Sequence, residues 1–150
     1  ISYSLSVQNR RKSRVGHALE NHLEQVFEDN AITYSRGKET ENKAKPDFIF
    51  PSIQHYHNPK FPDTYLTMLG VKSTCKDRWR QVLSEAVRIR EKHLLTLEPG
   101  ISENQTDEMV ANKLQLIIPQ SLHSTYKPNQ QIWLVNVQTF LKLTKTRQLA

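Results

Sequence analysis

The stretch from residue 65 to residue 87 constrains the fold of this 150-residue chain more than any other. An apolar run over residues 65–71 ends at Lys72 and predicts a buried strand. After a short polar turn, apolar residues recur at helical spacing and predict a helix that packs through one stripe, made of Trp79, Val82, Leu83, Ala86 and Val87. At roughly 100° per residue, Glu85 lies on the flank of that stripe. We therefore expect a strand end and a helix flank to bring Lys72 and Glu85 together.

A second apolar run, over residues 45–51, predicts a short buried strand between two prolines. The period of two places Asp47 and Ile49 on one face of this strand, and Phe48 and Phe50 on the other. An unpaired aspartate is costly to bury in such apolar surroundings. Asp47 therefore needs a hydrogen-bonding partner or a metal ion.

The rest of the chain predicts an α/β domain with a central mixed sheet of about five strands flanked by helices. We expect a helix over residues 13–29 whose buried stripe includes His22, a loop or short edge strand over 34–45, strands over 94–97, 114–118 and 132–135, short helices after 102–108 and before 126, and a last helix over 137–145. No internal repeat or low-complexity linker interrupts the sequence, so residues 1–150 are expected to form a single domain. The first residue is not methionine, which suggests a fragment of a longer protein.

The net charge of +6 and the pI near 9.5 favour a polyanionic partner such as a nucleic acid. Basic residues gather near the start of the chain and around the predicted central helix, at Arg11, Arg14, Lys76, Arg78 and Arg80. The single cysteine, Cys75, cannot form an internal disulfide and fits a reducing compartment such as the cytoplasm. We find no signal-peptide pattern and no apolar run close to the ~20 residues of a membrane span.

Asp47, Lys72 and Glu85 form a set that suits metal-assisted hydrolysis of a phosphodiester. Carboxylates hold a hard divalent cation, and Mg²⁺ needs only two or three of them because it keeps several water ligands. An ammonium group can steady the developing charge or orient the attacking water. Glu20, at the flank of the first predicted helix, could serve as an outer carboxylate.

Several of these residues resemble the signature of the PD-(D/E)XK nucleases. Pro46-Asp47 followed by Val71-Lys72 matches its aspartate on one strand and lysine on the next. Gly70, however, stands where the family usually carries an acidic residue. In one subgroup of restriction endonucleases the acidic residue is found on the following helix, and Glu85, 13 positions after Lys72, matches that spacing.

Two further motifs resemble the same subgroup. Lys76-Asp77-Arg78 matches its basic–acidic–arginine triplet, and Arg14-x-Gly16-x-x-Leu19-Glu20 matches its first helix. From about Arg11 to the last helix, the chain is therefore similar to the C-terminal catalytic domain of EcoRII-type restriction endonucleases. In that family an N-terminal effector domain precedes the catalytic domain, so we expect the present sequence to correspond to the catalytic part alone.

The resemblance implies a restriction-endonuclease-like fold and a Mg²⁺-dependent endonuclease of a prokaryotic cytoplasm. Asp47 and Glu85 would bind Mg²⁺, Lys72 would assist the attacking water, and Glu20 would help from an outer position. The triplet Lys76-Asp77-Arg78 would read a CC:GG core, because Lys and Arg donate to guanine and an acidic residue accepts from cytosine. The partners would be double-stranded DNA, at a short palindromic site like CCWGG, and a second copy of the chain.

Each assignment has a structural alternative. Asp47 could bond only to backbone, Lys72 could be a solvated strand end, and Glu85 could pair with Arg88 on an exposed helix face. The triplet could cap a helix. Tyr56 could contact a DNA phosphate or simply pack in the core.

Other chemistries remain as alternatives for the chain as a whole. The histidines His55 and His57 could bind zinc with Cys75 or His93, although no paired ligand spacing supports this. The fold could also serve a nuclease with a repair or structure-specific role, or a DNA-binding remnant without catalysis.

Overall fold

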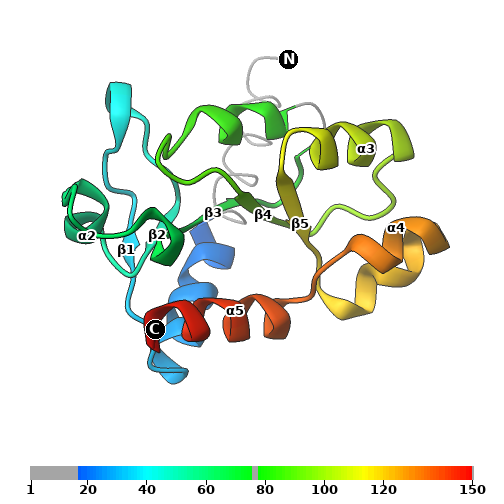
Figure 1. The fold of residues 1–150 in the computed structure, drawn as a ribbon. Coiled ribbons are helices and arrows are strands. Elements are labelled where there is room, and N and C mark those ends of the chain that lie inside the picture. The colour runs from blue at the N-terminus through cyan, green and yellow to red at the C-terminus, as the bar shows by residue number, and fades with distance from the viewer. Residues whose placement is uncertain (1–16, 76–77, 150) are drawn as a thin grey trace, which may run out of the picture.

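The centre of the molecule is a five-stranded sheet in the order β1-β2-β3-β4-β5 (Figure 1). The computed structural model describes residues 17–75 and 78–149. Its strands are β1 Ser35–Arg36, β2 Phe48–Phe50, β3 Thr67–Lys72, β4 Lys92–Thr96 and β5 Leu114–Ile117. β1, β2 and β3 pair antiparallel, whereas β3, β4 and β5 pair parallel. The predicted mixed sheet is confirmed, and the segment 34–45 supplies its edge strand.

Helices cover both faces of this sheet. Figure 1 shows α3 on one side, and α5 with the helix of residues 17–29 on the other. The α-helices are α2 Ile53–His57, α3 Glu103–Ala111, α4 Pro128–Trp133 and α5 Val137–Leu149; the 3₁₀ helices are η1 Glu41–Lys43, η2 Asp63–Tyr65, η3 Arg78–Ser84 and η4 Gln120–Thr125. Within the described ranges, none of the helices has the length and apolar character that a bilayer crossing requires.

The alternation of side chains along β2 and β3 divides the core into two clusters. Phe48 and Leu69 pack on one face, with the helix of residues 17–29 and α5. Ile49 and Met68 pack on the opposite face, with residues of η3 and α3. By the same alternation, the backbone positions of Asp47, Gly70 and Lys72 fall on the face that η3 covers.

The strand predicted over residues 132–135 is wrong. Pro128 instead begins α4, at a position where its missing N–H costs nothing. The side chain of Gln130 accepts a hydrogen bond from the N–H of Lys127 (2.8 Å) and closes the first turn. Ile132 is 89% exposed, and only Val135 reaches the sheet, through an isolated bridge to Ile117. The run of β-branched and aromatic residues is typical of a strand, but the proline at residue 128 starts a helix that continues into it.

The helix of residues 17–29 ends where it was predicted to end, but its buried stripe is narrower. Leu23 and Phe27, four residues apart, carry the packing against the sheet. His22 is exposed, so its assignment to the buried stripe is wrong. The helix contacts the sheet through one edge, and a residue one step from Leu23 turns about 100° away from it.

Candidate active site

Glu85 lies directly after η3 rather than on an α-helix, which corrects the expected geometry. In a 3₁₀ helix, residues three apart eclipse one another, so Trp79 and Val82 form one row facing the sheet. The N–H of Glu85 donates to the carbonyl of Val82 (3.2 Å) and continues this three-residue step. The carboxylate is therefore half-buried, whereas Val87, predicted to be buried, is 63% exposed. The 3₁₀ step turns Glu85 inward.

Gly70 provides the space into which η3 packs. A Cβ at this position would lie 3.1 Å from Cγ2 of Val82 and 3.5 Å from Cδ1 of Leu94. Val82 is only 1% exposed, so it has little room to move away. The absence of a side chain at Gly70 thus allows η3 to approach β3 closely and delivers Glu85, three residues after Val82, to the same end of the strand.

Asp47 stands immediately before β2 and is held by β3. Its Oδ2 accepts a hydrogen bond from the N–H of Val71 (2.7 Å). Burial raises the pKa of Asp47 above its usual range, although the Val71 N–H, the Lys72 ammonium and Glu20 act in the opposite direction. One carboxylate oxygen of Asp47 is thereby oriented by the backbone, as the structural alternative required, yet the group still interacts with other charges.

The structure brings Glu85, Asp47 and Lys72 together. Burial raises the pKa of Glu85, and the charge of Asp47 raises it further, to about 7, against the opposing effects of Lys72 and Lys92. By the alternation of the strands, Asp47 and Lys72 fall on the face of the sheet that η3 covers, and Glu85 follows η3 directly. Two carboxylates with raised pKa values and an ammonium group beside them form a site that a cation would stabilise.

Glu20, from the helix of residues 17–29, joins this group from the outside. Its carboxyl hydrogen bonds with that of Asp47, and its pKa is raised by burial and then by the Asp47 charge. The guanidinium of Arg36, on β1, lies 3.6 Å from Glu20 and 2.6 Å from Glu24. Sequence analysis missed Arg36, because nothing local in a two-residue edge strand signals which carboxylates it will face.

The donor set limits what kind of metal the site could hold. Across residues 17–75 and 78–149, no three or more His, Cys, Asp and Glu side chains gather in a group able to hold a metal ion. A pair of carboxylates fits Mg²⁺, which takes oxygen ligands and usually keeps several waters, better than it fits zinc. The chemistry of Asp47 and Glu85 is therefore compatible with the predicted Mg²⁺.

The histidine and cysteine alternatives find no support in the described residues. His55 Nδ1 lies 2.6 Å from the Ser52 hydroxyl, and His57 Nε2 lies 2.9 Å from the Glu39 carbonyl. The Cys75 thiol is buried, which raises its pKa to about 12, and it donates to the Glu98 carboxylate (3.3 Å). A thiol in this state is neither a good metal ligand nor a good nucleophile.

The structure describes only some of the residues that are expected to contact DNA. Arg11, Arg14, Lys76 and Asp77 lie outside the described residues. Arg78 begins η3, and its guanidinium lies 3.4 Å from the Thr74 carbonyl. Arg80 forms an ion pair with Glu108 of α3 and lies 4.5 Å above the Trp79 ring.

Tyr56 is buried and hydrogen-bonded within the described structure. It is 1% exposed, and its hydroxyl donates to the Glu41 carboxylate (2.6 Å) and accepts from the N–H of Arg88 (3.2 Å). This environment fits the alternative in which Tyr56 packs in the core.

Comparisons with known proteins agree with this architecture. A family model described as "EcoRII C terminal" matches residues 1–141. The type II restriction enzyme EcoRII of Escherichia coli is 44% identical over 142 residues, which cover 94% of this chain and 35% of that enzyme. The chain thus spans about a third of the length of this relative.

Two solved structures share the fold. They are metal-depleted Ecl18kI in complex with uncleaved DNA (TM-score 0.79, 23% identity, 96% of this chain and 49% of that one) and with uncleaved, modified DNA (0.78, 21%, 96% and 48%). The expected restriction-endonuclease-like fold is confirmed by this likeness. By its match to the family model and its identity to EcoRII, this chain belongs to the EcoRII C-terminal family.

Proposed function

We propose that this chain is the catalytic domain of a Mg²⁺-dependent type II restriction endonuclease that hydrolyses double-stranded DNA at a short palindromic site with a CC:GG core. The observation that carries the proposal is the convergence of Glu85, Asp47 and Lys72 at the ends of β2, β3 and η3. Membership of the EcoRII C-terminal family supports the same activity.

The residues of the site divide the work of hydrolysis. Asp47 and Glu85 would hold the Mg²⁺ ion, and the Val71 N–H keeps Asp47 in place. When bound, Mg²⁺ supplies a Lewis acid that clamps phosphate oxygens and makes a water more acidic. The Lys72 ammonium would orient the attacking water and counter the charge that develops on the phosphate. Glu20, bonded to Asp47, would keep that carboxylate aligned.

Recognition would come from the triplet Lys76-Asp77-Arg78, which leads directly into η3. Lys and Arg donors suit the O6 and N7 acceptors of guanine, and an aspartate suits the N4 donor of cytosine. Since η3 also delivers Glu85, movement of the triplet onto its bases would be transmitted to the metal site. A palindromic site would be matched by a two-fold dimer of this domain.

The decisive experiment is cleavage of a plasmid and of duplexes carrying CCWGG or a scrambled site, with Mg²⁺ or with EDTA. The wild-type chain should cut the CCWGG duplex with Mg²⁺ only, while Asp47→Asn and Lys72→Ala should not cut. Glu39→Gln is the matched control, because Glu39 is exposed and pairs only loosely with Lys45 (3.9 Å).

Other outcomes would redirect or end the proposal. Equal cutting of branched and scrambled duplexes would indicate a structure-specific nuclease. Binding without cutting at any Mg²⁺ concentration would indicate a DNA-binding remnant. Normal cutting by Asp47→Asn would remove Asp47 from the catalytic site.

A further inference from the structure

The turn that carries Glu85 is held by polar contacts rather than by a helix or a strand. η3 ends at Ser84 and β4 begins at Lys92, with bends and turns between them. Ala86, next to Glu85, has φ of 55°, a region that residues with a Cβ rarely adopt. Such a conformation persists only where surrounding contacts hold it.

Lys92 supplies one of these contacts from the start of β4. Its side chain is buried, with 5% of the residue exposed, and its Nζ donates to the carbonyls of Ala86 (2.6 Å) and Ile89 (2.5 Å). The ammonium also interacts with the charges of Glu85 and Glu41. A buried ammonium is tolerated only when it is paired in this way, so Lys92 and the turn restrain each other.

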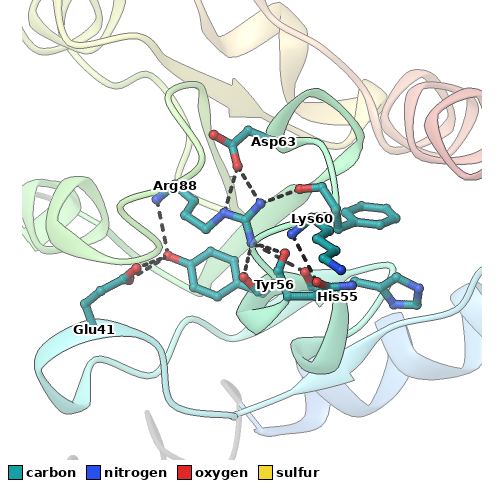
Figure 2. Close-up of polar contacts among 8 residues, drawn as sticks. Glu41, His55, Tyr56, Lys60, Asp63 and Arg88 are labelled. Atoms are coloured by element: carbon teal, nitrogen blue, oxygen red, sulfur yellow. Dashed lines mark hydrogen bonds and ion pairs between the residues drawn. The ribbon is translucent and has the colours of Figure 1, made fainter.

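Arg88 ties the turn to a second segment of the chain (Figure 2). Its guanidinium donates to the carbonyls of Tyr56, Asn58 (3.0 Å) and Phe61 (2.5 Å), and it binds the Asp63 carboxylate through Nε (2.7 Å). These acceptors, together with the more distant His55 carbonyl (3.5 Å), all lie in the segment that runs from α2 to η2. A planar guanidinium with several donors can satisfy them simultaneously, which a lysine cannot.

The backbone around Arg88 is bonded to the same region. The N–H of Val87 donates to the Glu41 carboxylate (3.3 Å), and the N–H of Arg88 donates to the Tyr56 hydroxyl (3.2 Å). The Tyr56 hydroxyl in turn donates to Glu41 (2.6 Å), as Figure 2 shows. Three consecutive residues after Glu85 are thus fixed, at the carbonyl of Ala86 and at the amides of Val87 and Arg88.

From these contacts we infer that Arg88 and Lys92 are positioning residues that fix the Glu85 carboxylate opposite Asp47 and thereby set the affinity of the site for its divalent cation. The inference rests on the proposed function of Glu85. Lys92 bonds the carbonyls of Ala86 and Ile89, and Arg88 ties its own backbone to the segment from α2 to η2, so both would act on Glu85 through the turn. Outer partners of metal ligands commonly change metal affinity or activity by about 10–100-fold when they are mutated.

The test compares Lys92→Met and Arg88→Lys with the control Arg90→Lys in the full chain. Arg90 is exposed, and no described residue hydrogen bonds to its side chain, so the control makes the same exchange two residues away. Cleavage is titrated with Mg²⁺, and the rise of Tm with Mg²⁺ is measured without DNA. We expect the half-saturating Mg²⁺ concentration to increase about tenfold or more in both variants, with a smaller Mg²⁺-dependent rise in Tm. DNA binding in EDTA should match the control.

Wild-type Mg²⁺ dependence in the two variants would overturn the inference, as would a lower maximal rate with unchanged half-saturation. If Lys92→Met does not fold, Arg88→Lys, which keeps the positive charge beside Asp63, decides the question. Glu85→Gln separates this inference from the proposed function. If Glu85→Gln cuts DNA normally, the proposed function fails; if it does not cut while both positioning variants behave as wild type, only the inference fails.

Discussion

Two carboxylates are associated with the turn after η3 and behave in opposite ways: Glu85, which the turn carries, and Glu41, which accepts a hydrogen bond from the Val87 N–H. Burial raises the pKa of Glu85 to about 7, because no hydrogen-bond donor in the described structure compensates it and Asp47 repels it. Burial also acts to raise the pKa of Glu41, but hydrogen bonds from the Tyr56 hydroxyl and the Val87 N–H outweigh it, and the pKa is lowered. Where hydrogen-bond donors reach a carboxylate, as at Glu41, the carboxylate contributes to the stability of the fold. Where they do not, the carboxylate remains available to a cation, as we propose for Glu85.

The contrast between Glu85 and Glu41 fails most clearly if Glu85 can be replaced without loss of cleavage. We expect Glu85→Gln to lower the cleavage rate by at least about a hundredfold, because an amide is a much weaker ligand for Mg²⁺ than a carboxylate. Plasmid cleavage with saturating Mg²⁺ measures the effect. Folding and DNA binding in EDTA serve as controls, and an active Glu85→Gln enzyme would place Glu85 with Glu41 among the structural carboxylates.

Arg78 tests whether η3 connects recognition to the site. Arg78→Ala should weaken binding to the CCWGG duplex by about 1–3 kcal/mol, the range for one lost bidentate base contact. Binding is measured by titration at fixed salt on cognate and scrambled duplexes. An equal loss on both duplexes would show that Arg78 contacts a phosphate instead of a base.

The opposite pKa shifts predict opposite effects on stability without metal. The folded pKa of Glu85, about 7, exceeds the ordinary 4.5, so the folded state binds more protons and the free energy of unfolding falls as pH rises between these values. Glu85→Gln should therefore stabilise the protein at pH 8, on the order of 1 kcal/mol.

Glu41 should respond with the opposite sign. Its pKa is lowered, so its contribution is present above pH 4.5 and is lost as pH falls through the folded pKa. Glu41→Gln should then destabilise the protein at pH 8 by about 1 kcal/mol. Urea unfolding in EDTA at pH 5 and pH 8 checks both variants, and shifts of the same sign would contradict the contrast.

The smallest effect is expected from Asp63, whose carboxylate pairs with Arg88. Its side chain is 61% exposed, and without it Arg88 keeps four carbonyl acceptors, those of His55, Tyr56, Asn58 and Phe61. Asp63→Asn should cost less than about 1 kcal/mol and leave the Mg²⁺ dependence of cleavage unchanged. Thermal unfolding and the Mg²⁺ titration measure this, and a large loss would show that the ion pair, rather than the carbonyl contacts, holds Arg88.

Several parts of the molecule could be predicted from local sequence. Apolar runs bounded by prolines or polar residues located β2, β3, β4 and β5, because burial on both faces leaves a recognisable pattern. The spacing of Asp47, Lys72 and Glu85 indicated the family, and the family match agrees. The prediction over residues 132–135 was wrong because Pro128 starts a helix that extends into a run of residues typical of a strand.

The amino-acid sequence by itself determined the family to which the chain belongs and which segments form β2 to β5, since both depend on residue type and short-range spacing. Only the tertiary structure shows that η3 is a 3₁₀ helix. Because Gly70 has no side chain, Val82 packs closely against β3, and Glu85, three residues later, lies near the charge of Asp47. The tertiary structure also decided that Arg88 binds carbonyls 27 and 30 residues away, at Phe61 and Asn58. Such contacts depend on how distant segments pack, and no local pattern records them.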